Sequence, residues 1–342
     1  MYQASRRRFL AAASVAAVGA AVEIPRRASG QSAIRLRISS SITADQNSAH
    51  YIWYQRFDAN LKAATGARVA LEFFPNSQLG KEADVVQQVK VGSIDMMLTG
   101  SSIWATVTPE FGMLDLGYVF DSYAHMAKAL DGGVGASLGE WLRNRTGCSV
   151  LGWGSHFAAR SVYSKAPIRS LAELRGLKLR VLPTTAFIDT FKAMNAVPTP
   201  IAFNELYTAL QTGVVDGFEH DAATVLASKL YEVVKSCFLT EHLFGPMVAV
   251  IGKRGLDKIP ADIRPALLKA ATEATLYQRG LAAEKGHAAF DELKRLGITF
   301  YPMAKNERDA LRKEIETKVW SAFAAQYPGT KPLFQAIAAA RA

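Results

Sequence analysis

The order of apolar segments between residues 34 and 98 most constrains what this chain can fold into. Strand-like apolar runs are separated by segments whose apolar residues recur at helical spacing. We expect strands at Ile34–Ser39, Val69–Phe74 and Ser93–Leu98, and helices at Ala49–Ala64 and Glu82–Val91. A strand–helix–strand–helix–strand order predicts a mostly parallel sheet with helices on both faces, which is an α/β fold.

A second series of strands and helices begins near Val150. We expect strands at Leu177–Leu182, Val214–Phe218, Tyr231–Phe238 and Met247–Ile251, and helices at Thr184–Met194, Phe203–Thr212, Ala261–Leu296 and Asn306–Ala325. The chain has 342 residues, which is enough for two domains of ordinary size. The helix expected at 261–296 is long enough to span both of them.

Two polar loops are candidate walls of a binding site. Ligands of open α/β sheets bind beyond the carboxyl ends of the strands. The loops Ser39–Ser48 and Thr99–Ser102 both follow expected strands. Within and near them, we take Thr99 and Glu72 as candidate ligand contacts.

The first thirty residues have the composition of an export signal. Ser5-Arg6-Arg7-Arg8-Phe9-Leu10 is a twin-arginine pattern, followed by an apolar, alanine-rich run to Val22 and by small residues at Ala28-Ser29-Gly30. The apolar run is too short to span a bilayer. We therefore expect residues 1–30 to be a twin-arginine signal peptide and the mature protein to be periplasmic.

The charge and the cysteines restrict the class of protein further. The formal net charge is +10, but basic residues are scattered among acidic ones and form no stripe, so we expect no nucleic-acid partner. Cys148 and Cys237 are the only cysteines, without metal-ligand spacing. An exported protein permits a disulfide between them, although two isolated buried thiols is the interpretation that we prefer.

Arg180 is the leading candidate for a ligand-binding residue. It lies at the end of the apolar run Leu177–Leu182, which Pro183 must terminate. A guanidinium offers a planar fork of donors that fits a carboxylate, and the helix expected to begin at Thr184 adds N–H groups that favour an anion. The alternative is a surface ion pair.

Several separated motifs resemble one known family. The segments 74–80 (FPNSQLG), 89–95 (VKVGSID), 176–181 (GLKLRV) and 205–217 (ELYTALQTGVVDG) have the order and spacing of the DctP-type solute-binding proteins of TRAP transporters. The resemblance extends from about Ile34 to Pro332. It implies two α/β lobes, joined by crossing segments and a long helix, that close around a ligand.

The resemblance also implies a domain division, partners and site residues. The lobes would be residues 31–157 with about 246–285, and 158–245 with about 286–342. Partners would be a small organic acid and the small and large TRAP membrane subunits, with sodium-coupled uptake. Arg180 would grip the ligand carboxylate and Arg160 would line the pocket. Glu219 matches a glutamate of metal-assisted relatives, so a bound cation near it is possible, although the tryptophan that follows in them is absent here.

Other candidate contacts have ordinary structural alternatives. His220 stands where sialic-acid binders of the family have asparagine, and it either binds ligand or packs against Asp221 or Glu219. Arg160 could be an exposed residue near a hinge, and Asn204 could cap a helix instead of binding ligand. Aromatic residues at such positions are more often core than ligand contacts. Those considered as an apolar wall are Phe218, Trp153, Phe157 and Phe203.

Other classes of protein are less consistent with the sequence. There is no P-loop, HExxH or GxGxxG turn. Glu219, His220 and Asp221 are adjacent, and neighbouring residues of a strand point to opposite faces, so the three cannot converge on a substrate. We therefore expect no enzyme and no cofactor. An ABC-type or sensor-linked binding protein remains the nearer alternative, and a periplasmic enzyme the more distant one.

Overall fold

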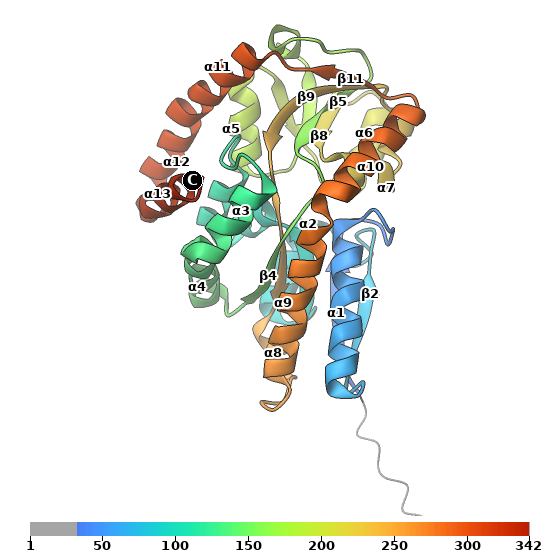
Figure 1. Cartoon of the computed structure of the whole chain (residues 1–342), viewed down its shortest axis with the longest axis vertical. Helices are drawn as coiled ribbons and strands as arrows, with labels where there is room; N and C mark the ends of the chain where they lie inside the picture. Colours follow the sequence, from blue (N-terminus) through green and yellow to red (C-terminus); the bar gives the residue numbers. More distant parts are fainter. Residues whose placement is uncertain (1–32, 342) are drawn as a thin grey trace, which may run out of the picture. The chain divides into compact units, whose positions relative to one another are not determined.

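The computed structural model describes residues 33–341, so the expected signal peptide at 1–30 lies outside the described residues. The described chain contains a five-stranded and a six-stranded sheet, each covered by helices (Figure 1). This confirms the expected two-lobed α/β fold. Within 33–341, no helix combines the length and apolar character needed to cross a membrane.

The first sheet has the strand order β2-β1-β3-β10-β4. Its strands are β1 (Ile34–Ser40), β2 (Val69–Phe74), β3 (Met96–Gly100), β4 (Ser149–Ser155) and β10 (Pro246–Ile251). β1 pairs in parallel with β2 and β3, as expected, but β10 is antiparallel to both β3 and β4. Four of the five strands therefore run in the same direction, as a mostly parallel sheet requires, and only β10 runs in the opposite direction.

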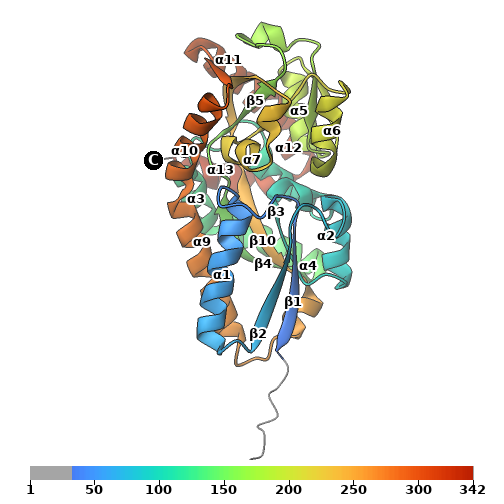
Figure 2. The same cartoon turned by 90° about the vertical axis from the view of Figure 1, so that its right-hand side faces the viewer.

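Helices α1 (Ala49–Thr65), α2 (Glu82–Val91) and α9 (Arg264–Gly280) belong to the lobe of this sheet. α1 begins where the side chain of Ser48 accepts a hydrogen bond from Tyr51 N, and ends at Gly66 in the left-handed conformation. Figure 2 shows α1 and α9 side by side. The indole of Trp53 in α1 donates to Thr275 Oγ1 of α9 (2.9 Å) within their shared apolar interface.

The second sheet has the order β11-β9-β5-β8-β6-β7. Its strands are β5 (Arg160–Ser164), β6 (Lys178–Val181), β7 (Val197–Pro200), β8 (Gly217–His220), β9 (Ser236–Leu243) and β11 (Thr299–Pro302). β8 and β9 both begin later in the sequence than expected. The cause at β8 is that Gly213 adopts a positive φ after the preceding helix, so residues 214–216 form the link. At β9, residues 230–232 form a 3-10 turn instead.

Four helices of the described chain pack around the second sheet. They are α5 (Thr185–Ala193), α6 (Leu206–Gln211), α7 (Ala222–Ala227) and α10 (Ala282–Arg295). The expected helix 261–296 is in fact two, α9 and α10, interrupted at Leu281. α9 starts at Arg264 because Pro265 is tolerated only in a first turn, and Gly280 is a weak helix former at the break. α9 packs on α1 and β4, whereas α10 packs on α7, so the pair still links the lobes.

The chain crosses between the lobes at two further places. Residues 156–159 connect β4 to β5, and Phe244-Gly245 connects β9 to β10. The remaining helices are α3 (Tyr123–Ala129), α4 (Gly135–Thr146), α8 (Lys253–Asp257), α11 (Lys305–Ile315), α12 (Ser321–Gln326) and α13 (Lys331–Ala339). A π-helical turn joins α11 to α12, which together match the helix expected at 306–325. α13 packs against α3 and α11 against α5, so the carboxyl-terminal helices contact both halves.

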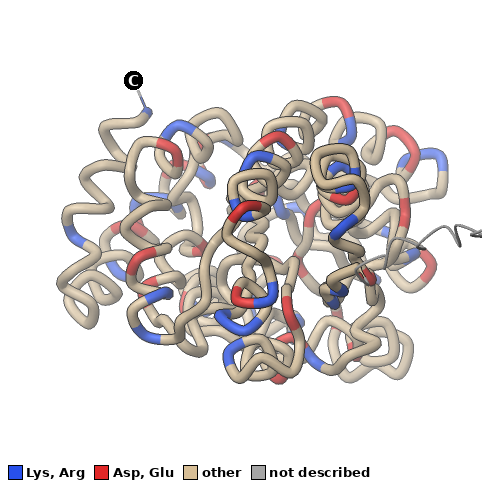
Figure 3. The backbone as a smooth tube through the Cα atoms, turned by 90° about the horizontal axis from the view of Figure 1, so that it is seen from below, with Lys and Arg blue, Asp and Glu red and all other residues tan. Residues whose placement is uncertain are grey.

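The distribution of charged residues and the state of the two cysteines agree with the sequence analysis. Lys and Arg are interspersed with Asp and Glu along the described chain (Figure 3), and many form short-range ion pairs such as Lys62–Asp58. Cys148 and Cys237 are buried free thiols. The preferred interpretation, two isolated thiols, is confirmed.

Candidate functional site

Arg180 has a fully buried guanidinium that is only partly bonded. It lies in β6, between β7 and β8, one residue before the strand ends at Val181. Its Nε donates to the carbonyl of Ile201 (2.8 Å), but Nη1 and Nη2 have no hydrogen-bond partner among the described residues. Burial lowers the pKa of Arg180 to about 10, against the attraction of Glu219 and Glu82, so the side chain stays charged at neutral pH. A buried cation with two free donors is a ready partner for a carboxylate.

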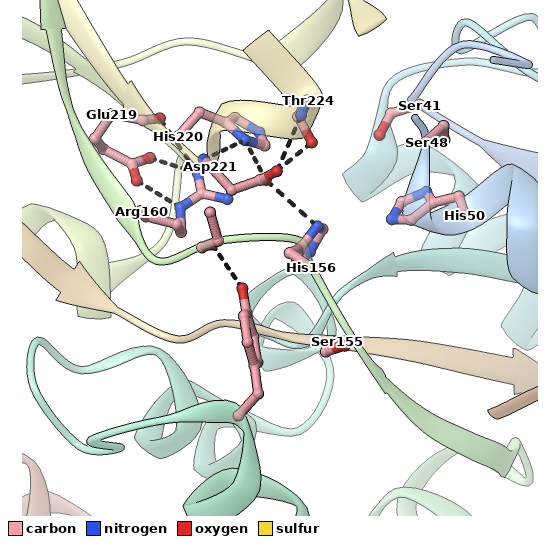
Figure 4. Close-up of polar contacts among 12 residues, drawn as sticks. Ser41, Ser48, His50, Ser155, His156, Arg160, Glu219, His220, Asp221 and Thr224 are labelled. Carbon is pink, nitrogen blue, oxygen red and sulfur yellow. Dashed lines mark hydrogen bonds and ion pairs between the residues drawn. The ribbon is translucent and has the colours of Figure 1, made fainter. Parts of the chain in front are cut away.

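Arg160 is already paired within the protein. Its Nε lies 2.6 Å from Oε2 of Glu219 and its Nη2 lies 2.7 Å from Oε1, a bidentate ion pair between β5 and β8 (Figure 4). Burial alone would raise the pKa of Glu219, but the attraction of Arg160 and of His242, whose Nε2 lies 3.5 Å from Oε2 of Glu219, lowers it to about 2. The guanidinium of Arg160 also lies 5.2 Å from the ring of Phe187. The unpaired positive charge of this region therefore belongs to Arg180.

The same ion pair bears on the cation considered near Glu219. Both carboxylate oxygens of Glu219 face Arg160, which is a poor environment for a metal ion. Residues 33–341 contain no group of three or more His, Cys, Asp or Glu side chains placed to hold a metal. The residues present do not fit a metal at this position.

Asp221 organises the end of β8. It caps α7, with Thr224 N and Thr224 Oγ1 each donating to its carboxylate at 2.9 Å. Nδ1 of His220 lies 2.8 Å from Oδ2 of Asp221, and Nδ1 of His156 lies 3.7 Å from the same oxygen (Figure 4). Both histidines are buried, and burial lowers their pKa values well below the usual range. His220 is thus a packed histidine held by Asp221, and it remains beside the cleft through its contact with Phe203 (5.4 Å).

A chain of ring contacts connects Arg180 with the first lobe. The guanidinium of Arg180 lies 5.8 Å from the ring of Phe203, and the ring of Phe203 lies 5.4 Å from that of His220. The rings of His220 and His156 are 6.2 Å apart, and those of His156 and His50 are 5.6 Å apart. Because His50 begins α1 in the first lobe and His220 ends β8 in the second, this row of side chains spans the space between the lobes.

The first lobe adds a polar wall from the ends of its strands. Thr99 Oγ1 and Ser41 Oγ donate to Oε1 of Glu82 at 2.8 and 2.9 Å. Other buried polar atoms of the described chain lack a protein partner; they belong to Ser77, Ser102, Trp104, Ser155 and Thr184. Unsatisfied buried polar atoms are rare in proteins. These five residues lie at or shortly after the ends of strands, which makes the region a candidate binding site.

Three of the predicted aromatic residues lie next to this region in the chain or in the sheets, with their side chains packed in the core. Phe218 stacks on Tyr163 (5.4 Å) and Phe157 is fully buried among apolar residues, while Trp153 packs on Phe111 (5.4 Å). These three are core residues, which is the alternative to ligand contact that the sequence analysis gave for them. Glu72 forms a surface ion pair with Arg35 on the first sheet.

Asn204 lies exposed at the rim of a pocket with Ser41 and Phe203. The structural alternative considered for Asn204, a helix cap, does not apply, because Ala202 and Glu205 occupy the cap positions. Sequence reasoning missed His50, His156 and Glu82. Their signal was their place at strand and helix ends beside the loops 39–48 and 99–102.

A two-lobed α/β fold, with a buried and only partly bonded arginine in one lobe, is typical of periplasmic ligand-binding proteins. Comparison with known proteins gives the family. The family model described as bacterial extracellular solute-binding protein, family 7, named DctP, matches residues 40–326. This chain belongs to that family, whose members named below are binding proteins and not enzymes.

Relatives and solved structures agree with this assignment. The chain is 32% identical over 292 residues to the 2,3-diketo-L-gulonate-binding periplasmic protein YiaO of Escherichia coli, covering 85% of this chain and 88% of that protein. It is 29% identical to the C4-dicarboxylate-binding periplasmic protein DctP of Rhodobacter capsulatus, covering 77% and 79%. A TRAP periplasmic solute-binding protein of Chromohalobacter salexigens, solved with D-glucuronate, superposes with a TM-score of 0.83 at 25% identity, covering 89% and 99%.

Proposed function

We propose that this protein captures a sugar acid and grips its carboxylate with Arg180. The observation that carries the proposal is the guanidinium of Arg180, which is fully buried and yet leaves Nη1 and Nη2 without partners in the described chain. A planar fork of two N–H donors matches the two oxygens of one carboxylate. Leaving such a group unpaired is costly, so a ligand carboxylate stabilises the closed arrangement.

The ligands of related proteins support a sugar acid in particular. Solved relatives at 25% identity or more hold β-D-galacturonate, D-erythronate or D-glucuronate. These molecules share one carboxylate and several hydroxyl groups. The cleft of this chain offers the corresponding groups, namely one unpaired cation and many neutral polar atoms.

The capture mechanism that we propose is closure of two lobes without covalent chemistry. One lobe would comprise residues 31–157 with about 246–285, and the other 158–245 with about 286–342. Arg180 approaches the ligand from the second lobe and His50 from the first. Because the ligand contacts both lobes only when they are closed, its binding shifts the population toward the closed form.

We further propose that the protein acts in the periplasm, after twin-arginine export directed by residues 1–30. The closed form would deliver its ligand to the small and large membrane subunits of a TRAP transporter, with uptake driven by a sodium gradient. Family membership is the support for this step. Sodium-dependent uptake of a labelled sugar acid, reconstituted with the neighbouring membrane genes, should require this protein.

The binding step is tested on the purified mature protein. A thermal-shift screen with D-glucuronate, D-galacturonate, D-erythronate, galactonate and succinate should raise the melting temperature for at least one sugar acid. Calorimetry should then give a stoichiometry of about one, and the bound acid should be recovered unchanged. A protein that binds none of these acids, or that turns one over, would overturn the proposed function.

A further inference from the structure

Two buried imidazole nitrogens between the lobes have no hydrogen-bond partner in the described chain. They are Nε2 of His50 and Nδ1 of His156. The two rings lie 5.6 Å apart, and both residues are at least nine-tenths buried. Figure 4 shows the ring of His50 directed toward His156 and Asp221. We call His50 and His156 the histidine pair.

Both members of the histidine pair are neutral at physiological pH. Burial lowers the pKa of His50 to about 4, although Asp221 opposes the change. Burial likewise holds the pKa of His156 well below its usual range. A neutral imidazole has one N–H donor and one acceptor nitrogen, so the pair calls for a partner that can do both.

The hydrogen bonds of His50 indicate which of its nitrogens carries the proton. Nδ1 of His50 lies 2.8 Å from Ser40 Oγ, and that hydroxyl already accepts from Ile42 N (3.1 Å). The other acceptor near Ser40 Oγ, the carbonyl of Ile42, is farther away at 3.4 Å. The Ser40 hydroxyl is therefore best placed to donate to Nδ1 of His50, which leaves Nε2–H as a free donor.

The charges around the pair exclude a second carboxylate. Oδ2 of Asp221 lies 3.7 Å from Nδ1 of His156. The nearest buried cation of the second lobe, Arg160, is already engaged by Glu219. The first lobe contributes further carboxyl groups. Glu82 accepts from Ser41 and Thr99, and the buried Asp115 accepts from Ser101. An additional anion would face Asp221 without a free counter-charge, which is strongly unfavourable in a buried site.

We propose that His50 and His156 form a hydroxyl-binding subsite opposite Arg180, which restricts the ligand to monocarboxylic acids with a hydroxylated body. This inference rests on the proposed function, since it assumes that Arg180 holds the ligand carboxylate. A hydroxyl group both donates and accepts, and it carries no charge. Short dicarboxylates lack such hydroxyls and bring a second charge, so they bind poorly.

The test is calorimetry with D-glucuronate and succinate on the parent protein and on four variants. His50→Leu and His156→Leu should each weaken D-glucuronate binding about ten- to a hundredfold, because each leaves a ligand hydroxyl unpaired. His50→Gln, which keeps a donor, should bind within about fivefold of the parent. His287→Leu is the matched control, because His287 is an exposed histidine on α10, and it should change nothing.

A pH series separates ligand recognition from a merely structural role. The affinity of the parent should fall between about pH 6.5 and 5, because closure requires neutral histidines. Glu219, with a pKa lowered to about 2, and Arg180, with a pKa lowered to about 10, keep their charges over this range. Burial raises the pKa of Asp115, which interacts with Arg160 and Glu219, to about 7, so this group also titrates. The contribution of His50 is therefore the difference in slope between the parent and His50→Gln. His50→Gln should therefore show a shallower slope than the parent.

Each outcome decides the proposal. Unchanged D-glucuronate affinity in both leucine variants, or a glutamine variant as weak as His50→Leu with the slope of the parent, would overturn the subsite while the proposed function stands. Succinate binding within about tenfold of D-glucuronate would overturn the exclusion of dicarboxylates. If the parent binds no sugar acid at all, the proposed function and the subsite fail together.

Discussion

Replacing Arg180 by methionine tests the grip on the ligand carboxylate. Methionine keeps an unbranched side chain but removes every donor of the guanidinium. Removing one partner of a buried ion pair costs about 3–5 kcal/mol. Since each 1.4 kcal/mol is a factor of ten in Kd, the Kd for D-glucuronate should rise by about a hundred- to a few thousandfold. Lysine at this position should give an intermediate loss, because it keeps the charge but not the fork.

The unliganded protein should respond in the opposite direction. Burial lowers the pKa of Arg180 from 12.5 to about 10. One pKa unit corresponds to about 1.36 kcal/mol, so the charged side chain loses roughly 3 kcal/mol in the closed arrangement before a ligand arrives. Methionine does not carry this cost. Unliganded R180M should therefore melt at the same temperature as the parent or higher.

Calorimetry and thermal melts measure both effects on the same samples. Arg175→Met is the matched control, because Arg175 is an exposed arginine just before the same strand, and both quantities should stay unchanged. The reasoning would be refuted by R180M binding D-glucuronate within about threefold of the parent. A fall of its unliganded melting temperature together with unchanged binding would assign Arg180 a structural role instead.

Other perturbations have calculable effects. Glu219→Gln removes the carboxylate that neutralises Arg160, so urea unfolding should show a loss of about 3–5 kcal/mol; less than about 1 kcal/mol would contradict that role. Burial lowers the pKa of His50 from 6.5 to about 4, so its neutral form stabilises the closed protein fully above pH 6.5, and this contribution is lost as the pH falls toward 4. Melts of the ligand complex should show that decline, and His50→Gln should reduce it. The Lys81–Glu205 ion pair joins the lobes, but both side chains are about half exposed. Lys81→Ala should therefore change the Kd less than about fivefold. A larger change would show that this ion pair stabilises the closed form.

The part of the site that could be predicted from sequence is the part fixed by local pattern. Arg180 stands at the end of a strand that a proline terminates, and the structure places it there, buried. The partner of Arg160 depends instead on strand register. Val162 of β5 pairs with Glu219 of β8, although the two strands are more than fifty residues apart in the sequence. No local pattern indicates that this pairing neutralises Arg160.

His50 and His156 escaped prediction for a related reason. Each is a single histidine at the end of an ordinary element, and only the packing of the lobes brings their rings within 5.6 Å. The direction of β10 and the break at Leu281 were not predicted either. The apolar pattern of a segment indicates which of its residues are buried, but it does not indicate which other segments pack against them. Glu72 shows the converse error: it lies in a correctly predicted strand, but its side chain pairs on the surface with Arg35.

A crystal structure of the D-glucuronate complex tests the central claim most directly. The account predicts the two oxygens of the ligand carboxylate within hydrogen-bond distance of Nη1 and Nη2 of Arg180, with the Arg160–Glu219 ion pair intact and the ligand hydroxyl groups directed toward His50 and His156. A carboxylate bound to Arg160 in place of Glu219, or a ligand with no contact to Arg180, would contradict it.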